Sequence, residues 1–254
     1  MSWIAPHLLI KPGDVAKYVL LPGDPARAKR IAEFLDGAML KSVNREFVVY
    51  TGRYKGVEVS VTSTGIGGPS TAIAVEELAR CGAKYFIRVG TCGALRKGIA
   101  VGDIIVPYGA VRLDGVTKRY VSPEYPAVAH PVIFNALTKI ARELNINVIT
   151  GIVVSDDMFY VSLNELKYWS SLNAVAIEME ASTIMVLASL KGLYGGAILV
   201  VDGNIIEGTG KADVGASGKS EVSQVVKEAI DKEIRIALEA VKYIAEKGCE
   251  EVEC

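Results

Sequence analysis

The chain has 254 residues, half of them hydrophobic, and a formal net charge of −1 at pH 7. This length fits one sizeable α/β domain or two small ones. Because the sequence contains no internal repeat and no Pro/Ser-rich linker, we expect residues 1–254 to form a single domain. The net charge is close to zero and neither half of the chain is strongly basic. The sequence therefore lacks the positive charge with which proteins bind the phosphate backbone, and nucleic acid is not an expected partner.

Strand and helix patterns alternate along the chain. Apolar runs predict strands at residues 18–21, 47–54, 57–64, 85–89, 103–107, 148–154 and 197–201. Amphipathic or apolar segments predict helices at residues 26–35, 71–80, 131–144, 181–190 and 220–247. This alternation favours an α/β sandwich, with helices on a central sheet. Strands 47–54 and 57–64 are joined by a short Lys55-Gly56 turn, which indicates a mixed sheet rather than a purely parallel one.

The N-terminal segment lacks the features of a secretory signal. Residues 1–12 contain no basic stretch followed by an apolar run. The longest apolar run, residues 195–201, is far shorter than the roughly 18 residues needed to span a bilayer. We therefore expect a cytoplasmic protein with no membrane partner.

The four cysteines do not form a metal-binding pattern, because no histidine lies near any pair of them. Cys81 and Cys92 are predicted to be buried small hydrophobes. Cys249 and Cys254 bracket a polar tail, and the sequence leaves open whether they form a disulfide.

Three predicted strands end in loops that carry glycine with a basic or hydroxyl residue. The first loop contains Gly23 and Arg27, the second spans residues 64–70, and the third is a predicted turn at residues 90–93. Loops after parallel strands meet at the carboxyl edge of the sheet, where ligands bind. Glycine lets the backbone approach an anion, and a helix N-terminus supplies N–H donors.

Arg88 lies inside an otherwise apolar strand. A buried guanidinium needs a partner, and we expect an anionic ligand to provide it. Any one of these loops could be an ordinary turn. Because arginines accompany two separate glycine turns, we interpret the set as a phosphate-binding site.

Residues 178–180 (EME) place two carboxylates at a predicted strand-to-helix junction. Glu180 can accept two hydrogen bonds from a sugar diol, and Met179 offers an apolar edge to the ring. Acidic residues at a helix start also interact favourably with the helix dipole. On composition alone the second interpretation is the better one.

Together these segments resemble the nucleoside phosphorylase family, which includes uridine phosphorylases, hexameric purine nucleoside phosphorylases and some methylthioadenosine phosphorylases. The resemblance runs from His7 to the C-terminal helix and rests on residues 22–27, 44–47, 63–70, 88–93 and 178–180. Segments 71–78, 111–115 and 125–129 are most similar to uridine phosphorylases. The implied activity is phosphate-dependent cleavage of an N-glycosidic bond, giving a free base and (deoxy)ribose 1-phosphate. Uridine is the first implied substrate, with purine nucleosides and methylthioadenosine as alternatives.

The resemblance also implies individual roles. The implied phosphate ligands are Gly23, Arg27, Arg45, Arg88 and Thr91. The implied ribose ligands are His7, Thr91, Glu178, Met179 and Glu180. The implied base contacts are Cys92, Gly93 and Phe159.

In this family His7 and Arg45 reach in from a neighbouring subunit, which implies a homo-oligomer, of hexameric type, with shared active sites. A monovalent cation such as potassium is implied at Glu46, Ile66 and Ser70. No organic cofactor is implied, because inorganic phosphate is a co-substrate.

Two departures leave the base open. The Gln and Arg with which uridine phosphorylases read uracil are missing after Phe159. Purine enzymes place an acid at the position of Gly203, whereas here Asp202 precedes it by one residue. A one-residue slip on a strand reverses the side-chain face, although a glycine-containing strand end could re-aim the side chain. Asp202 is our candidate acid, and Arg88 is the second candidate catalytic residue.

Two other classes of protein remain as alternatives. A nucleoside hydrolase on the same scaffold would use water and would have no need for the paired Arg27 and Arg88. A non-catalytic nucleoside-binding protein could retain the pocket without turnover, which the displaced Asp202 leaves open.

Overall fold

The computed structural model describes residues 3–209 and 224–248. Its strands are β1 (Tyr18–Leu21), β2 (Asp36–Asn44), β3 (Phe47–Tyr54), β4 (Val57–Thr62), β5 (Tyr85–Ala94), β6 (Ile104–Arg112), β7 (Ala127–Val128), β8 (Val148–Ser155), β9 (Ala176–Glu178) and β10 (Tyr194–Asn204). Its helices are α1 (Pro25–Ala32), α2 (Gly68–Arg80), α3 (Thr117–Tyr120), α4 (Pro131–Glu143), α5 (Leu163–Ser171), α6 (Ala181–Leu190) and α8 (Gln224–Lys247).

All the strands belong to one mixed sheet, as predicted. Its order is β10-β6-β8-β9-β5-β1-β4-β3-β2, with β7 paired to β6. Strands β4, β1, β5 and β10 run parallel, whereas β2, β3 and β4 form an antiparallel meander. Because β10 pairs with both β5 and β6, one end of the sheet closes into a ring through β9 and β8.

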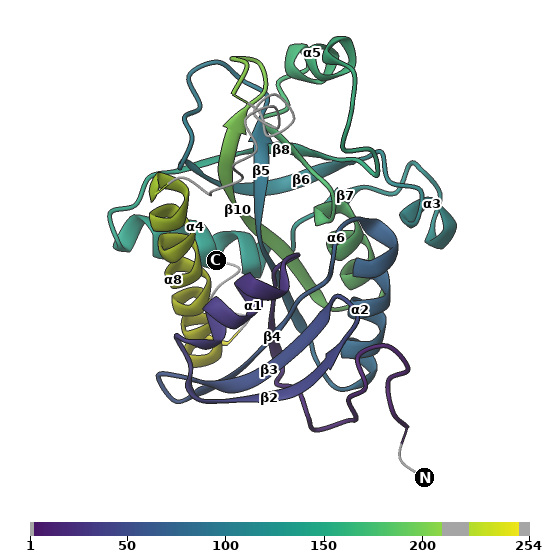
Figure 1. The fold of residues 1–254 in the computed structure, drawn as a ribbon, viewed down its shortest axis with the longest axis vertical. Helices are drawn as coiled ribbons and strands as arrows, with labels where there is room; N and C mark the ends of the chain where they lie inside the picture. The colour runs from purple at the N-terminus through teal and green to yellow at the C-terminus, as the bar shows by residue number, and fades with distance from the viewer. Residues whose placement is uncertain (1–2, 210–223, 249–254) are drawn as a thin grey trace.

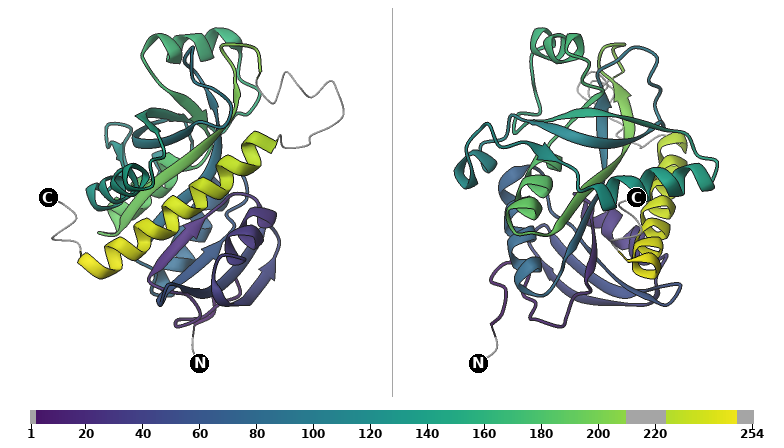
Figure 2. Two further views of the ribbon diagram at one scale, coloured as in Figure 1. Left: turned by 90° about the vertical axis from the view of Figure 1, so that its left-hand side faces the viewer. Right: turned by 180° about the vertical axis from the view of Figure 1, so that it is seen from behind.

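Helices cover both faces of the sheet, which is the predicted sandwich (Figures 1 and 2). On one face α1, α4 and α8 pack over a core that includes Ile31, Leu137 and Ile236. On the other face α2 and α6 pack over a core that includes Leu78 and Ile184. Helix α8 crosses the sheet obliquely beside α1 and α4 (Figure 2, left). No helix in the described ranges has the length and hydrophobicity to span a bilayer.

Several predicted elements differ from those observed. The predicted turn at residues 90–93 is wrong, because β5 continues to Ala94 in register with β10. The glycines that suggested a turn instead allow side chains to approach the strand, since a Cβ at Gly93 would be 2.7 Å from Ile205 Cδ1. Strand β2, with its mostly exposed residues, was not predicted, because it lacks the alternation of a half-buried strand.

Helix α1 stops at Ala32, three residues before the predicted end, and a tighter turn follows in which the Phe34 N–H donates to Ile31 O. Cys81 and Cys92 are buried free thiols, as predicted. Residues 220–223 of the predicted last helix, and Cys249 and Cys254, lie outside the described residues.

Candidate active site

A cavity of about 1080 Å³ opens where β1, β5, β9 and β10 reach their carboxyl ends. Its volume is that of a site for a drug-sized small molecule. The lining comes from the last residues of β5, β9 and β10, from the loop between β1 and α1, from the loop before α2 and from residues 158–166. This position at the carboxyl edge is the one the glycine loops predict.

The first two glycine loops are bonded to one another through their backbones. The Thr64 N–H donates to Pro22 O at 2.9 Å, and the Gly65 N–H donates to Gly23 O at 3.0 Å. A side chain at Gly23 would meet the Gly65 carbonyl oxygen at 3.1 Å, so glycine allows this approach. The Asp24 carboxylate accepts a hydrogen bond from the Ala26 N–H at 2.8 Å and caps α1. The rim therefore presents a helix N-terminus next to Arg27.

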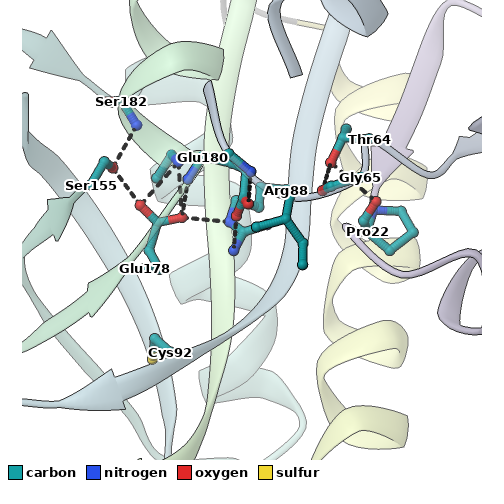
Figure 3. Close-up of polar contacts among 12 residues, drawn as sticks. Pro22, Thr64, Gly65, Arg88, Cys92, Ser155, Glu178, Glu180 and Ser182 are labelled. Atoms are coloured by element: carbon teal, nitrogen blue, oxygen red, sulfur yellow. Dashed lines mark hydrogen bonds and ion pairs between the residues drawn. The ribbon is translucent and has the colours of Figure 1, made fainter. Parts of the chain in front are cut away.

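Arg88 extends from β5 toward two carboxylates (Figure 3). Its Nε lies 2.7 Å from Glu178 Oε2, and its Nη2 lies 2.6 Å from Glu180 Oε2. All three residues are 5 % exposed or less. Our expectation that an anionic ligand supplies the partner of Arg88 is therefore wrong in part, since the protein already provides two counter-charges. Arg88 Nη1 forms no ion pair with a described residue, so this nitrogen can donate to an anion.

The two carboxylates are themselves held by the backbone. Glu178 accepts hydrogen bonds from the N–H groups of Glu180 and Ala181, each at 2.9 Å to Oε2. It also accepts one from the Ser155 hydroxyl, which in turn accepts from the Ser182 N–H at 2.9 Å. Glu180 accepts from the Gly67 N–H at 2.6 Å. The acids thus occupy the N-terminal end of α6, where its dipole favours negative charge, and Glu180 also lines the cavity.

Gly90 provides the space in which the Arg88 guanidinium lies. A Cβ atom at Gly90 would be 2.6 Å from Arg88 Cζ and 2.8 Å from each Nη. Any side chain at this position would displace the guanidinium from the two glutamates. The glycine therefore serves close packing within a strand rather than a turn.

Burial and charge set the protonation of these groups. Burial lowers the pKa of Arg88, but the adjacent Glu180 and Glu178 outweigh it and raise that pKa overall, so the guanidinium stays charged. Burial raises the pKa of Glu180, and the charge of Arg88 opposes the increase. Burial, reinforced by Asp202 and Glu178, raises the pKa of Cys92 well above its usual value. Cys92 is therefore a neutral lining group and not a thiolate nucleophile.

Asp202 lines the cavity because β10 is irregular at this residue. Val201 pairs with Cys92 and Gly203 pairs with Gly93, so Asp202 is an extra residue between two consecutive pairs. Such a bulge re-aims a side chain that regular alternation would send to the other face. The one-residue displacement seen in the sequence is thus compensated by the backbone.

The opposite end of the cavity is apolar and more open. Phe159 and Tyr160 are 51 % and 81 % exposed, and their rings meet edge to face with centroids 5.0 Å apart. Ile177 and Ile205 close this end from β9 and from the segment after β10. Neither isoleucine was predicted as a site residue, because an apolar residue next to a strand end carries no signal that separates lining from core.

Most of the predicted site residues line this one cavity. They are Gly23, Arg27, Glu46, Ile66, Ser70, Arg88, Thr91, Cys92, Gly93, Phe159, Glu178, Met179, Glu180 and Asp202. His7 and Arg45 do not line it. The His7 backbone and Nδ1 contact Glu77, with Nδ1 2.7 Å from Oε1. Arg45 is exposed in the β2–β3 turn, where its φ is 54°.

The three residues of the expected cation site lie together at the rim. The Ser70 hydroxyl donates to the Ile66 carbonyl oxygen at 3.1 Å. A Cβ at Gly65 would be 2.7 Å from Glu46 Cγ and 3.2 Å from Ser70 Oγ, which places Glu46 and Ser70 on either side of Gly65. Ile66 itself is 77 % exposed.

The fold and cavity define an α/β protein with a cavity of small-molecule size, in which a helix N-terminus and two arginines lie beside a carboxylate pair. The model of the phosphorylase superfamily matches residues 17–242. The chain belongs to this superfamily and, within it, to the nucleoside phosphorylases.

Similar proteins include a guanosine phosphorylase of Halorubrum lacusprofundi, which is 44 % identical over 93 % of this chain and 97 % of its own length. A uridine phosphorylase of Thermococcus kodakarensis is 43 % identical over 88 % of this chain and 84 % of its own. Among solved structures, uridine phosphorylase from Vibrio fischeri has a TM-score of 0.86 at 33 % identity, covering 96 % of this chain and 98 % of that one. Purine nucleoside phosphorylase from Toxoplasma gondii, in complex with immucillin-H, has a TM-score of 0.87 at 32 % identity, covering 96 % and 97 %.

Proposed function

We propose that the protein is a nucleoside phosphorylase that uses inorganic phosphate to cleave an N-glycosidic bond. The products are a free base and (deoxy)ribose 1-phosphate. The observation that carries the proposal is the grouping of Arg27 and Arg88 with Glu180 in one cavity. A hydrolase would not require two cationic side chains there, and a simple binding protein would not require an acid such as Asp202 at the base end.

In the proposed reaction, phosphate attacks the glycosidic carbon as the base departs. Arg27, Arg88 and Thr91 hold the phosphate next to that carbon, with the backbone at Gly23. The guanidinium groups bind without transferring a proton, because arginine stays protonated. Glu180 accepts hydrogen bonds from the ribose hydroxyls, and Met179 packs against the ring. Rate acceleration then comes from orientation and from charge placed near a cationic sugar in the transition state.

The leaving base must be stabilised as it gains negative charge. Uridine is the first substrate that we propose, since several relatives are named uridine phosphorylases. A 6-oxopurine nucleoside such as guanosine is the second candidate. It is favoured by a guanosine phosphorylase among the relatives and by Asp202 at the cavity, where a protonated carboxyl could donate to a purine ring nitrogen. Phe159 and Cys92 would contact the base.

We also propose that the active site is completed by a neighbouring copy of the chain, which would contribute His7 and Arg45. Arg45 is exposed and His7 is half-buried, and neither lines its own cavity, which supports this arrangement. A hexamer in the cytoplasm is the assembly we expect. Glu46, Ile66 and Ser70 would hold a monovalent cation such as potassium at that subunit contact, and no organic cofactor is needed.

A nucleoside panel tests the proposal. Uridine, thymidine, guanosine, inosine, adenosine and methylthioadenosine are each incubated with the protein, with and without phosphate. We expect base release only with phosphate, together with ribose 1-phosphate detected by phosphorus NMR. Equal release without phosphate would indicate a hydrolase. Tight nucleoside binding without any release would indicate a binding protein.

A further inference from the structure

Glu233 is a fully buried carboxylic acid in the middle of α8, with 0 % exposure. It lies between the buried Ala229 and Ala237, in the apolar stripe with which α8 contacts the sheet. No described group donates a hydrogen bond of good length and angle to either carboxylate oxygen, and the Gly90 N–H, which faces the carboxyl, is the backbone donor that acts on it. An acid buried in this way is costly unless it is neutral or serves a purpose at that place.

The surroundings of Glu233 are those of the proposed phosphate site. Arg27 on α1 and Arg88 on β5 both act electrostatically on its carboxyl, as does the backbone N–H of Gly90. Gly90, Arg27 and Arg88 all line the cavity. Helix α1 is fixed to α8 at this level by Arg30, whose Nε and Nη2 contact the two oxygens of Asp231 at 3.0 and 2.8 Å. Glu233 therefore lies behind the cavity wall, within electrostatic reach of both guanidinium groups.

Several other charged groups on the elements around α8 are paired with one another and not with Glu233. Glu178 and Glu180 contact Arg88, and Asp231 and Glu33 contact Arg30. On α4 Lys139 pairs with Glu143, and on β4 Glu58 lies 4.0 Å from Arg53. Cys92 on β5 has a thiol whose pKa is raised well above its usual value, with Asp202 of β10 among the causes. Arg27 and Arg88 are thus the two cations that act on Glu233.

The charge balance of this cluster changes when an anion enters. Arg88 is already matched by two carboxylates, whereas Arg27 forms no ion pair within the described ranges. A phosphate dianion between the two arginines would face a third carboxylate at close range if Glu233 were ionised. Like charges that share a site cannot all stay ionised without a large cost. A proton on Glu233 removes this repulsion and leaves both guanidinium groups to the anion.

We propose that Glu233 is a positioning residue of the phosphate site, and that its carboxyl holds a proton when the anion lies between Arg27 and Arg88. Anion binding is thereby coupled to protonation of Glu233, and the proton comes from the solvent. The inference rests on the proposed phosphate site. Burial raises the pKa of Glu233 to about 8, with Arg27 and Arg88 opposing the increase. The coupling therefore becomes visible as the pH rises above this value.

Sulfate is the probe that isolates the effect, because it remains a dianion throughout the range in which phosphate itself titrates. Sulfate binding to the full-length protein is measured by titration calorimetry from about pH 6 to about pH 9. We expect the dissociation constant of the wild-type protein to increase about tenfold between pH 7 and pH 9, since one proton must be bound with the anion. Repeating the titration in buffers of different ionisation enthalpy should show an uptake approaching about one proton per sulfate at pH 9.

The variants Glu233→Gln and Glu233→Met both remove the titrating group, and the second keeps the volume if the amide disturbs folding. In either variant we expect a less than about twofold change in sulfate affinity over this range, and no proton uptake. Glu239→Gln on the same helix, whose partners are Tyr54 and Lys55, is the control and should behave as the wild type.

An undiminished pH dependence or proton uptake in both Glu233 variants would overturn the role of Glu233 alone. A wild-type protein that binds neither sulfate nor phosphate at any pH would instead overturn the phosphate site, and this inference with it.

Discussion

The two ends of the cavity are built in different ways. At the end that we propose binds phosphate and ribose, Arg88, Glu178 and Glu180 are almost fully buried and are joined by ion pairs of 2.6 and 2.7 Å. Backbone N–H groups at the start of α6 fix the two acids. At the other end, Phe159 and Tyr160 are half-exposed or more and contact each other edge to face.

We infer from this difference that the buried end orients the reacting groups and that the apolar end determines which base is accepted. The buried end has a single arrangement, because moving any one charge would leave another buried and unpaired. Orientation of phosphate and sugar depends on such rigidity. The apolar end can accept different bases with little cost to folding, since its aromatic side chains are held by few contacts. Substitutions at the two ends should therefore have different effects on stability as well as on activity.

The largest effect is expected from Arg88→Ala. Phosphorolysis should fall by a factor of about 10³ or more, because a transition-state donor is lost in a water-excluded site. The free energy of unfolding should also fall by about 3 to 5 kcal/mol, because Glu178 and Glu180 would be left buried without their counter-charge. Steady-state kinetics and urea denaturation measure the two losses. An active, equally stable variant would mean that the buried end is not the catalytic one.

The second-largest expected effect is a loss of folding stability at high pH, caused by the buried carboxyl of Glu233. Because the folded protein raises the pKa of Glu233 to about 8 from its ordinary value of 4.5, the stabilising contribution of its neutral form is complete below about pH 4.5. This contribution is lost progressively as the pH rises from 4.5 to 8. Between about pH 5 and about pH 9, wild-type protein should lose a few kcal/mol of unfolding free energy relative to Glu233→Gln. Denaturation curves that shift in parallel for the two proteins would contradict this.

Arg27→Ala should separate binding from folding. Arg27 is partly exposed and forms no ion pair within residues 3–209 and 224–248, so its removal leaves no buried charge unpaired. We expect kcat/KM for phosphate to fall by about 10- to 100-fold, which corresponds to the loss of charged hydrogen bonds. The melting temperature should change little. Lys29→Ala, at an exposed position of α1 that does not line the cavity, is the matched control and should leave the KM for phosphate unchanged.

The smallest effect is expected at the apolar end. Phe159→Ala should raise the KM for the nucleoside by about three- to tenfold, the value of an aromatic contact, and should leave the KM for phosphate and the melting temperature close to those of the wild type. Measuring the KM of the variant for both uridine and guanosine would show which nucleoside binds through contact with Phe159. A marked loss of stability would show that Phe159 belongs to the core and not to the open end.

The sequence was sufficient for the parts of the site that depend on local backbone chemistry. The glycines after β1 and before α2, the capping Asp24 and the acids before α6 each have a local physical reason, and these lie where they were expected, whereas the glycines at residues 90–93 lie inside β5. The alternating elements also predicted the mixed sheet with helices on both faces.

The parts that could not be predicted depend on contacts between distant segments. The partners of Arg88 lie about ninety residues further along the chain, and its charge alone suggested only that some anion was near. The bulge at Asp202 depends on the pairing of β10 with β5. Glu233 had one visible signal, an acid within the apolar stripe of a long helix, but its neighbours Arg27 and Arg88 appear only once α8 is packed on the sheet.

The central claim is that Arg27 and Arg88 hold one phosphate beside Glu180. A crystal structure of the protein with sulfate or phosphate tests it most directly. We predict density for a tetrahedral anion within hydrogen-bonding distance of both guanidinium groups and of the backbone at Gly23. Well-ordered arginines with no anion between them, at concentrations that saturate phosphate-dependent turnover, would contradict the account.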